Sequence, residues 1–161
     1  MIILGIDPGT AATGYGVIEV KNSPELVEYG CLSTSGKDNM VDRLRSIYEQ
    51  ISCIIDRFSP AEVAVEEVFF NRNTKTALSI GQARGVILLA VSSKGAKVFS
   101  YTPLEVKQAI TGYGRARKEQ IQHMIKKTFN LSHLPRPDDA SDAIAVALCH
   151  LYSRKLKNLS K

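Results

Sequence analysis

Two short apolar segments that each end in a carboxylate constrain the fold of this chain more than any other feature. Residues 2–7 (Ile-Ile-Leu-Gly-Ile-Asp) are too few for a stable helix, and a turn-forming Asp-Pro-Gly-Thr sequence ends them. Residues 62–66 (Glu-Val-Ala-Val-Glu) repeat this pattern. Such segments are typical of strands that are buried inside a sheet. We therefore predict two buried strands, one ending at Asp7 and the other at Glu66.

The other segments predict how the sheet is completed and covered. Residues 14–20 and 26–34 are rich in β-forming side chains, and a Lys-Asn-Ser-Pro turn separates them, so an antiparallel meander is expected. Residues 97–101 predict a fifth strand. Helical periodicity appears in residues 40–58, 76–93, 104–110 and 118–129, and again from about residue 138 to Tyr152. This order predicts an α/β fold in which helices cover a mixed sheet.

Length and composition indicate a single domain. The 161 residues, 44% of them hydrophobic, are expected to form one domain over residues 1–155, with residues 156–161 as a flexible tail. Met1 leads directly into the first strand without a secretory signal. No apolar run approaches the roughly 18 residues that span a bilayer, so we expect no membrane partner. The chain is therefore expected to be cytoplasmic.

The cysteines and histidines give no sign of a disulfide framework or a zinc site. Cys31, Cys53 and Cys149 lie far apart and form no CxxC pair, so we expect buried free thiols. The histidines lie in or near predicted helices without a partnering motif, and we expect them to be structural or exposed. They are His123, His133 and His150.

The net charge of +5 is concentrated in the second half of the chain. Residues 1–96 hold 9 Lys and Arg against 11 Asp and Glu, a balance of −2, whereas residues 97–161 hold 12 against 5, a balance of +7. A basic half favours a polyanionic partner such as nucleic acid. Lysines that only solubilise exposed helix faces would give the same count, so charge alone does not decide between these explanations.

Two further acids can join the strand-end carboxylates. Asp139 and Asp142 lie three residues apart in the first turns of the last predicted helix. If this helix packs across the ends of the two strands, four carboxylates surround one pocket, which is costly unless cations neutralise them. Mg²⁺ prefers oxygen ligands, and two such ions about 4 Å apart can hold the attacking and leaving oxygens of a phosphodiester. The pattern predicts phosphoryl transfer.

Spacing alone leaves alternatives open at these acids. Each one by itself could cap a turn or favour a helix dipole. Asp138 shares a helix face with Asp142 nearly as well as Asp139 does. Glu66 and Glu67 are adjacent, and strand alternation lets only one of them face the pocket.

Four segments together resemble the RuvC-type Holliday-junction resolvases of the ribonuclease-H-like superfamily. They are residues 5–10 with 13–16 (Gly-Ile-Asp-Pro-Gly-Thr and Thr-Gly-Tyr-Gly), 65–69 (Val-Glu-Glu-Val-Phe), 81–85 (Gly-Gln-Ala-Arg-Gly) and 139–143 (Asp-Ala-Ser-Asp-Ala). Their order and spacing agree with the family over nearly the whole chain. The resemblance implies a ribonuclease-H-like mixed five-stranded sheet flanked by helices. It also implies that the catalytic and metal-binding acids are Asp7, Glu66, Asp139 and Asp142, with Asp138 as an extra acid.

The resemblance further implies a function. The family suggests a bacterial, Mg²⁺-dependent crossover junction endodeoxyribonuclease that acts in recombination and repair beside a branch-migration helicase complex. A homodimer would bind a four-way junction and nick two strands of like polarity symmetrically, leaving 5′-phosphate and 3′-hydroxyl ends. Two Mg²⁺ ions per site are implied, with Mn²⁺ as a substitute. The helix containing Gly81 and Gly85 is our candidate dimer interface, although an ordinary core helix explains it equally well.

The same resemblance implies contacts with DNA. Phe69 matches a position that resembles a base-stacking wedge, and Phe70, Arg72 and Asn73 lie beside it in the sequence. Without the family, burial of at least one phenylalanine in the core is the simpler explanation. Basic residues that match or adjoin family positions are expected to contact phosphates. They are Lys107, Arg115, Arg117 and Lys118.

Three other functions compete with this hypothesis. An actin-like or sugar-kinase-like ATPase also places Asp-x-Gly-Thr after a first strand, but it needs two such domains to enclose a nucleotide. A non-catalytic junction-binding module would have no use for four clustered acids. A related nuclease acting on RNA would share the fold and differ only in its substrate.

Overall fold

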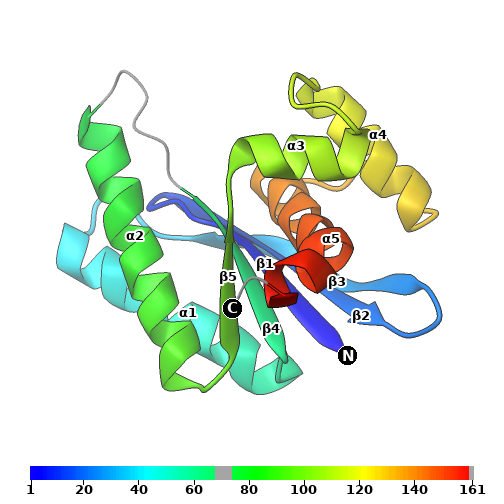
Figure 1. Ribbon diagram of the computed structural model, residues 1–161. Coiled ribbons are helices and arrows are strands. Elements are labelled where there is room, and N and C mark those ends of the chain that lie inside the picture. The colour runs from blue at the N-terminus through cyan, green and yellow to red at the C-terminus, as the bar shows by residue number, and fades with distance from the viewer. Residues whose placement is uncertain (68–73, 160–161) are drawn as a thin grey trace.

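The computed structural model describes residues 1–67 and 74–159, which form one mixed sheet with helices on both faces (Figure 1). β1 (Ile2–Asp7), β2 (Ala12–Val20) and β3 (Pro24–Ser33) form the antiparallel meander. β4 (Glu62–Glu66) and β5 (Lys97–Tyr101) continue the sheet parallel to β1, in the order β3-β2-β1-β4-β5. The predicted mixed five-stranded sheet is confirmed.

Burial on both faces explains why β1 and β4 lie at the centre of the sheet. The apolar side chains of β1 alternate between two separate cores, so Ile3 packs on one side and Leu4 on the other. The register pairs Ile6 with Val65, and each strand ends one residue later. Asp7 and Glu66 are therefore the last residues of neighbouring parallel strands, and they lie at the same edge of the sheet.

The helices form two layers. α1 (Met40–Phe58) and α2 (Thr74–Ser93) cover one face, and α5 (Asp138–Leu159) covers the other, with α3 (Pro103–Thr111) and α4 (Lys118–Thr128) beside it (Figure 1). Local sequence sets several of their ends. Asn39 caps α1, and Thr102 forms a capping box with Glu105 before the Pro103 that begins α3.

Two expectations about single elements need correction. α5 continues to Leu159, beyond the predicted end near Tyr152, because the lysines and arginine of this segment are compatible with the C-terminal half of a helix. Only one of the three cysteines is fully buried: Cys149 lies in the core, Cys31 is half-buried and Cys53 is exposed. Cys53 is exposed because it lies off the buried stripe of α1, which contains Ile51 and Ile54.

α2 also overturns the expectation that no segment is long and apolar enough for a membrane. Thr76–Ser93 passes that test on length and composition, and only 28% of this stretch is buried within the chain. Leu78 and Leu89 are 65% and 58% exposed, respectively. A Cβ added at Gly81 or Gly85 would meet no atom within 4 Å, so these glycines do not serve a close contact inside the described chain.

A buried polar cluster ties α5 to the sheet. Tyr101 Oη lies 2.8 Å from His150 Nδ1, and His150 Nε2 lies 2.9 Å from Glu62 Oε2. Arg154 Nε donates to the same carboxylate oxygen at 3.1 Å. Burial acts to raise the pKa of Glu62, but the hydrogen bonds from His150 and Arg154 outweigh it, and the pKa is lowered. His150 is thus structural, and His123 and His133 are exposed, as expected.

Replacing Glu62 should weaken the fold in a pH-dependent way. A carboxyl whose pKa is lowered by folding stabilises the protein above its unfolded pKa, and this contribution is lost as pH falls through the folded pKa. Glu62→Gln should therefore reduce the free energy of unfolding by about 2 kcal/mol at neutral pH. The difference from wild type should shrink in acid. Urea denaturation across an acid-to-neutral series measures this, with Glu25→Gln, whose side chain is 59% exposed, as the control. A pH-independent difference would contradict the expectation.

Candidate active site

Asp7 is held at the end of β1 by a hydrogen-bonded loop. Thr13 Oγ1 donates to the carbonyl oxygen of Gly9 at 2.6 Å and accepts from the Gly9 amide at 3.4 Å. Thr34 Oγ1 donates to the carbonyl oxygen of Thr10 at 2.5 Å. The turn after Asp7 is therefore fastened to β2 and to the end of β3, which fixes the direction in which the chain leaves the aspartate.

Asp7 and Glu66 form a close carboxyl pair. Burial, the charge of Glu66 and a side-chain hydrogen bond with Glu66 raise the pKa of Asp7 to about 9. Burial also raises the pKa of Glu66, against the opposing effect of its hydrogen bond with Asp7. Two buried carboxyl groups joined by a hydrogen bond share a proton at neutral pH unless a cation lies between or beside them.

α5 brings two more acids to this pair. The charges of Asp142 and Asp139 both act to raise the pKa of Asp7, so both helix acids lie within its electrostatic surroundings. Burial is the main cause of a raised pKa at Asp142 itself. The structure therefore brings together side chains from β1, β4 and the start of α5, and all four acids are the ones expected from the sequence.

Asp138 is occupied elsewhere. Its Oδ1 accepts from Arg136 Nη1 at 2.6 Å and from Gln122 Nε2 at 3.2 Å. Its charge contributes to the surroundings of Asp142 but is absent from the causes that raise the pKa of Asp7. Between the two helix acids that spacing left open as the partner of Asp142, Asp139 is the one whose charge acts on the strand carboxyl Asp7.

Two lysines border the acids. A pocket of about 230 Å³ is lined by Glu66 and Asp142, by Lys107 and Lys118, and by apolar side chains that include Val106 and Ile121. Lys118 Nζ lies 2.8 Å from Asp142 Oδ2 and 3.5 Å from Asp138 Oδ2. Burial acts to lower the pKa of Lys118, but its hydrogen bond and ion pair with Asp142 raise it overall. Lys118 thus neutralises part of the acidic charge.

The donor set suits a hard divalent cation. Among the described residues, no group of three or more His, Cys, Asp or Glu side chains is arranged to hold a metal ion. Mg²⁺ does not require such a cage, because it keeps several waters and binds through one or two carboxylates. Burial is the main cause that raises the pKa values of Asp7 and Glu66, and neighbouring acids add to it, so these two carboxyls are the pair that a bound cation would stabilise most in their charged forms.

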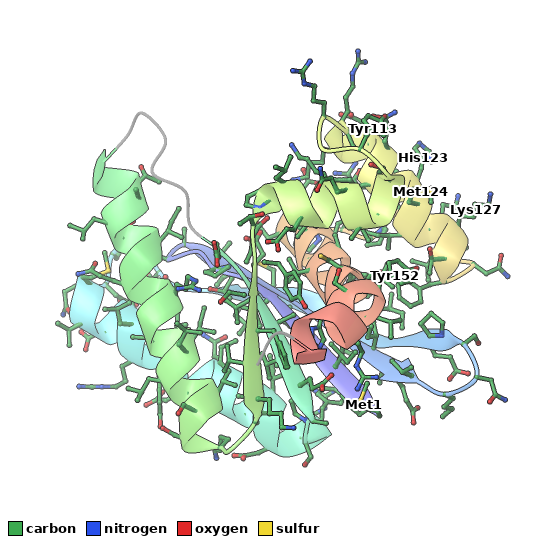
Figure 2. All side chains as sticks on the ribbon, viewed as in Figure 1. Met1, Tyr113, His123, Met124, Lys127 and Tyr152 are labelled. Atoms are coloured by element: carbon green, nitrogen blue, oxygen red, sulfur yellow. The ribbon has the colours of Figure 1, made fainter. Side chains whose placement is uncertain are left out.

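The other expected DNA contacts divide into two groups. Arg115 and Arg117 lie between α3 and α4, and with Tyr113 they line a second surface pocket. Figure 2 shows Tyr113 projecting from this connection, and His123 and Met124 on α4. The residues expected to form the base-stacking segment lie outside the described residues. They are Phe69, Phe70, Arg72 and Asn73.

Sequence reasoning missed two sets of residues that shape the site. Arg84 on α2 donates to the carbonyl oxygen of Glu66 at 3.3 Å and to Ser100 Oγ at 2.8 Å, so it holds the end of β4 against β5. Gly14 and Gly16 on β2 lie directly beneath α5. Glycines at alternate strand positions are a signal of close backbone approach that could have identified the second set.

The amino-acid sequence of this chain matches a known protein family over most of its length. The sequence family described as "Crossover junction endodeoxyribonuclease RuvC" matches residues 3–150. The Finegoldia magna crossover junction endodeoxyribonuclease RuvC is 48% identical over 162 aligned positions, which cover 100% of this chain and 99% of that protein.

Solved structures agree with the sequence comparison. The Thermus thermophilus RuvC structure superposes with a TM-score of 0.90 at 35% identity, covering 98% of this chain and 97% of that one. The T. thermophilus RuvC in complex with Holliday junction substrate gives a TM-score of 0.88 at 33% identity, covering 97% and 96%.

The acidic pair should destabilise the metal-free protein at neutral pH. Because folding raises the pKa of Asp7 from 3.8 to about 9, folding binds a proton in this window, and the free energy of unfolding falls as pH rises through it. Asp7→Asn should therefore melt higher than wild type in chelator at neutral pH, by about 3 °C or more, which corresponds to about 1 kcal/mol. Added Mn²⁺ or Mg²⁺ should raise the melting temperature of wild type but not of Asp7→Asn.

Thermal melts in chelator and in excess metal test this expectation. Asp56→Asn is the matched control, because Asp56 is exposed and its carboxylate forms an ion pair with Lys94 on the protein surface. An Asp7→Asn protein that melts below wild type in chelator would contradict the expectation.

Proposed function

The chain belongs to the RuvC family of crossover junction endodeoxyribonucleases, and we propose that its clustered carboxylates are the catalytic and metal-binding groups. Its function is that of the family, the nucleolytic resolution of Holliday junctions in DNA recombination and repair, and the family depends on divalent metal ions. Family membership removes the ATPase alternative. The observation that carries the proposal is the convergence of acids from β1, β4 and α5 beside a pKa of about 9 at Asp7. The residues proposed are Asp7, Glu66, Asp139 and Asp142.

The proposed mechanism assigns charge and position to this chain's own residues. Asp7 and Glu66 would hold the cation as deprotonated carboxylates, and Asp139 and Asp142 would complete the ligand set from α5. Bound Mg²⁺, with Mn²⁺ as a substitute and two ions per site, would supply activation of a water and stabilisation of the leaving 3′ oxygen. Hydrolysis in this sense leaves 5′-phosphate and 3′-hydroxyl ends.

Basic residues around the pocket are proposed to hold the DNA. Lys107 and Lys118 lie at the pocket itself, and Arg115 and Arg117 extend the positive surface along the connection to α4. Contacts of this kind orient the backbone without reading its sequence. The T. thermophilus RuvC structure that this chain resembles was solved with a Holliday junction substrate, which supports junction DNA as the ligand. The base-stacking role of Phe69, with Phe70, Arg72 and Asn73 beside it, stays a prediction.

We propose that the chain acts as a homodimer through α2. Leu78, Gly81, Gly85 and Leu89 recur at three- and four-residue steps, so they form one exposed stripe. The two glycines allow another backbone to approach closely, and the leucines supply apolar surface that the described part of this chain leaves uncovered. A two-fold dimer would present two identical sites to a junction whose opposite arms are related by a similar axis.

Two further expectations follow from junction processing. Association with a branch-migration helicase complex would deliver the junction to the dimer. Because the proposed substrate is chromosomal DNA and the relatives are bacterial, the cytoplasm of a bacterial cell is the proposed location.

Cleavage of a synthetic four-way junction tests the catalytic assignment. Wild type should make paired nicks with Mg²⁺ and none in chelator. Asp7→Asn and Glu66→Gln should lose at least about 10²-fold in cleavage rate, the order expected when one charge-stabilising group is removed, while still binding the junction. Asp138→Asn is the matched control and should still cleave, because its partners are Arg136, Gln122 and Lys118. Full activity in either variant, or equal cleavage of linear duplex, would refute the assignment.

Sedimentation equilibrium tests the interface. Leu89→Arg places a charge on the α2 stripe and should convert a dimer into a folded monomer, since Leu89 is 58% exposed and loses little packing inside the chain. Leu104→Arg on α3, at 55% exposure, is the matched control and should leave the dimer intact. A Leu89→Arg protein that remains dimeric at micromolar concentration would locate the interface elsewhere.

A further inference from the structure

α5 lies against β1 and β2 more closely than side chains would permit. A Cβ placed on Gly5 would lie 2.2 Å from the carbonyl oxygen of Ala143, and one on Gly16 would lie 2.8 Å from Ile144 Cγ1. At Gly14 the distance would be 1.9 Å, to the carbonyl oxygen of Asp139. The strand register places Gly5 opposite Gly16, so the glycines form a continuous seat for the helix, which lies across these strands in Figure 1.

Gly14 is the one of these three glycines that lies next to the candidate active site. It is the register partner of Asp7 on β1, and the atom nearest to its missing side chain belongs to Asp139 on α5. The distance between Asp7 on the strand and Asp139 on the helix therefore depends on Gly14, a residue that has no side chain of its own.

We propose that Gly14 is a positioning residue of the active site: the space left by its missing side chain allows the first turn of α5 to bring Asp139 and Asp142 to Asp7 and Glu66. This proposal rests on the proposed metal site and adds to it the element that sets its dimensions.

A side chain at position 14 would clash with the carbonyl oxygen of Asp139, and a small rearrangement would not relieve this clash. Carbon–oxygen contacts in proteins lie at about 3.3–3.6 Å, so a side chain at Gly14 would displace the Asp139 carbonyl by roughly 1.5 Å. That oxygen is backbone and cannot rotate away like the end of a side chain. Mg²⁺ demands near-ideal octahedral geometry at about 2.0–2.1 Å, and misplacement by 1 Å at a catalytic site can cost about 10²-fold.

The far end of α5 determines how the helix would respond. His150 and Arg154 are hydrogen-bonded to Glu62 on β4, two turns and more beyond the acids. With this end fastened, a clash at Gly14 would tilt the first turn away from the sheet, and Asp139 would move more than the residues after it.

Binding of Mn²⁺ alone, without DNA, tests the proposal independently of activity. Calorimetry or electron paramagnetic resonance would compare wild type with Gly14→Ala, at a temperature where near-ultraviolet circular dichroism shows each protein to be folded. Gly14→Ala should weaken Mn²⁺ binding by about tenfold or more, the usual range for residues that orient metal ligands. Leu148→Ala is the stability control, because it opens a cavity in the same helix without pushing on it. Leu148→Ala should change Mn²⁺ affinity by less than about twofold, because it leaves the positions of the metal ligands unchanged.

A compensating variant separates position from general damage. Glu is about one methylene longer than Asp, so Gly14→Ala with Asp139→Glu should bind Mn²⁺ more tightly than Gly14→Ala alone, although Asp139→Glu by itself should bind more weakly than wild type. Such non-additivity is not expected from destabilisation alone. A Cβ at Gly16 would lie 2.8 Å from Ile144 Cγ1 and 3.0 Å from the backbone of Ile144, a milder clash than at Gly14. Gly16→Ala should therefore show an intermediate loss of Mn²⁺ affinity, and it decides the question if Gly14→Ala does not fold.

Each outcome bears on the proposal. Wild-type affinity in folded Gly14→Ala, an equal loss in Leu148→Ala, or no loss in Gly16→Ala when Gly14→Ala is unfolded would overturn it. If wild type itself binds no Mn²⁺, and Asp7→Asn is indistinguishable from it, the proposed metal site fails instead.

Discussion

The structure depends on holding like charges together in a partly buried pocket. Burial and the neighbouring carboxylates raise the pKa of Asp7 to about 9, so the metal-free site is kept together against electrostatic repulsion. The rest of the fold supplies the restraint. Asp7 follows a central strand whose apolar residues contribute to both cores, and the chain beyond it is hydrogen-bonded to β2 and β3. α5 is fastened at its far end by a buried polar cluster.

Cationic side chains offset this repulsion locally. Lys118 bonds Asp142, and the charges of Lys107 and Lys118 act to lower the pKa of Glu66. The same lysines line the pocket through which the DNA backbone would approach. In the proposed complex with DNA, the same charges that offset repulsion in the free site would also attract the polyanion.

Much of this could be predicted from the sequence, because the decisive patterns are local. Apolar runs ending in a carboxylate located β1 and β4, and helical periodicity gave α1 with both ends correct. Where the sequence left alternatives open, the choice depends on contacts in the folded chain, mostly between residues that are distant in the sequence. The choice between Asp138 and Asp139 depends on Gln122 and Arg136, which engage Asp138. The pairing of Lys118 with Asp142 spans 24 residues, and no local pattern announces it. For the helix containing Gly81 and Gly85, the sequence left a dimer interface and an ordinary core helix equally open, since apolar composition does not say which surface covers the helix.

Gly14 shows how a site can depend on an absence. A search for chemically active side chains would not select Gly14. A mutational scan would find it as sensitive to substitution as the acids, because every other amino acid would add a side chain to the space that Gly14 leaves empty. Sensitivity to substitution and participation in chemistry are therefore separate properties in this protein. A redesign that transplanted only the four carboxylates onto another sheet would also need to copy an empty volume about the size of a methyl group.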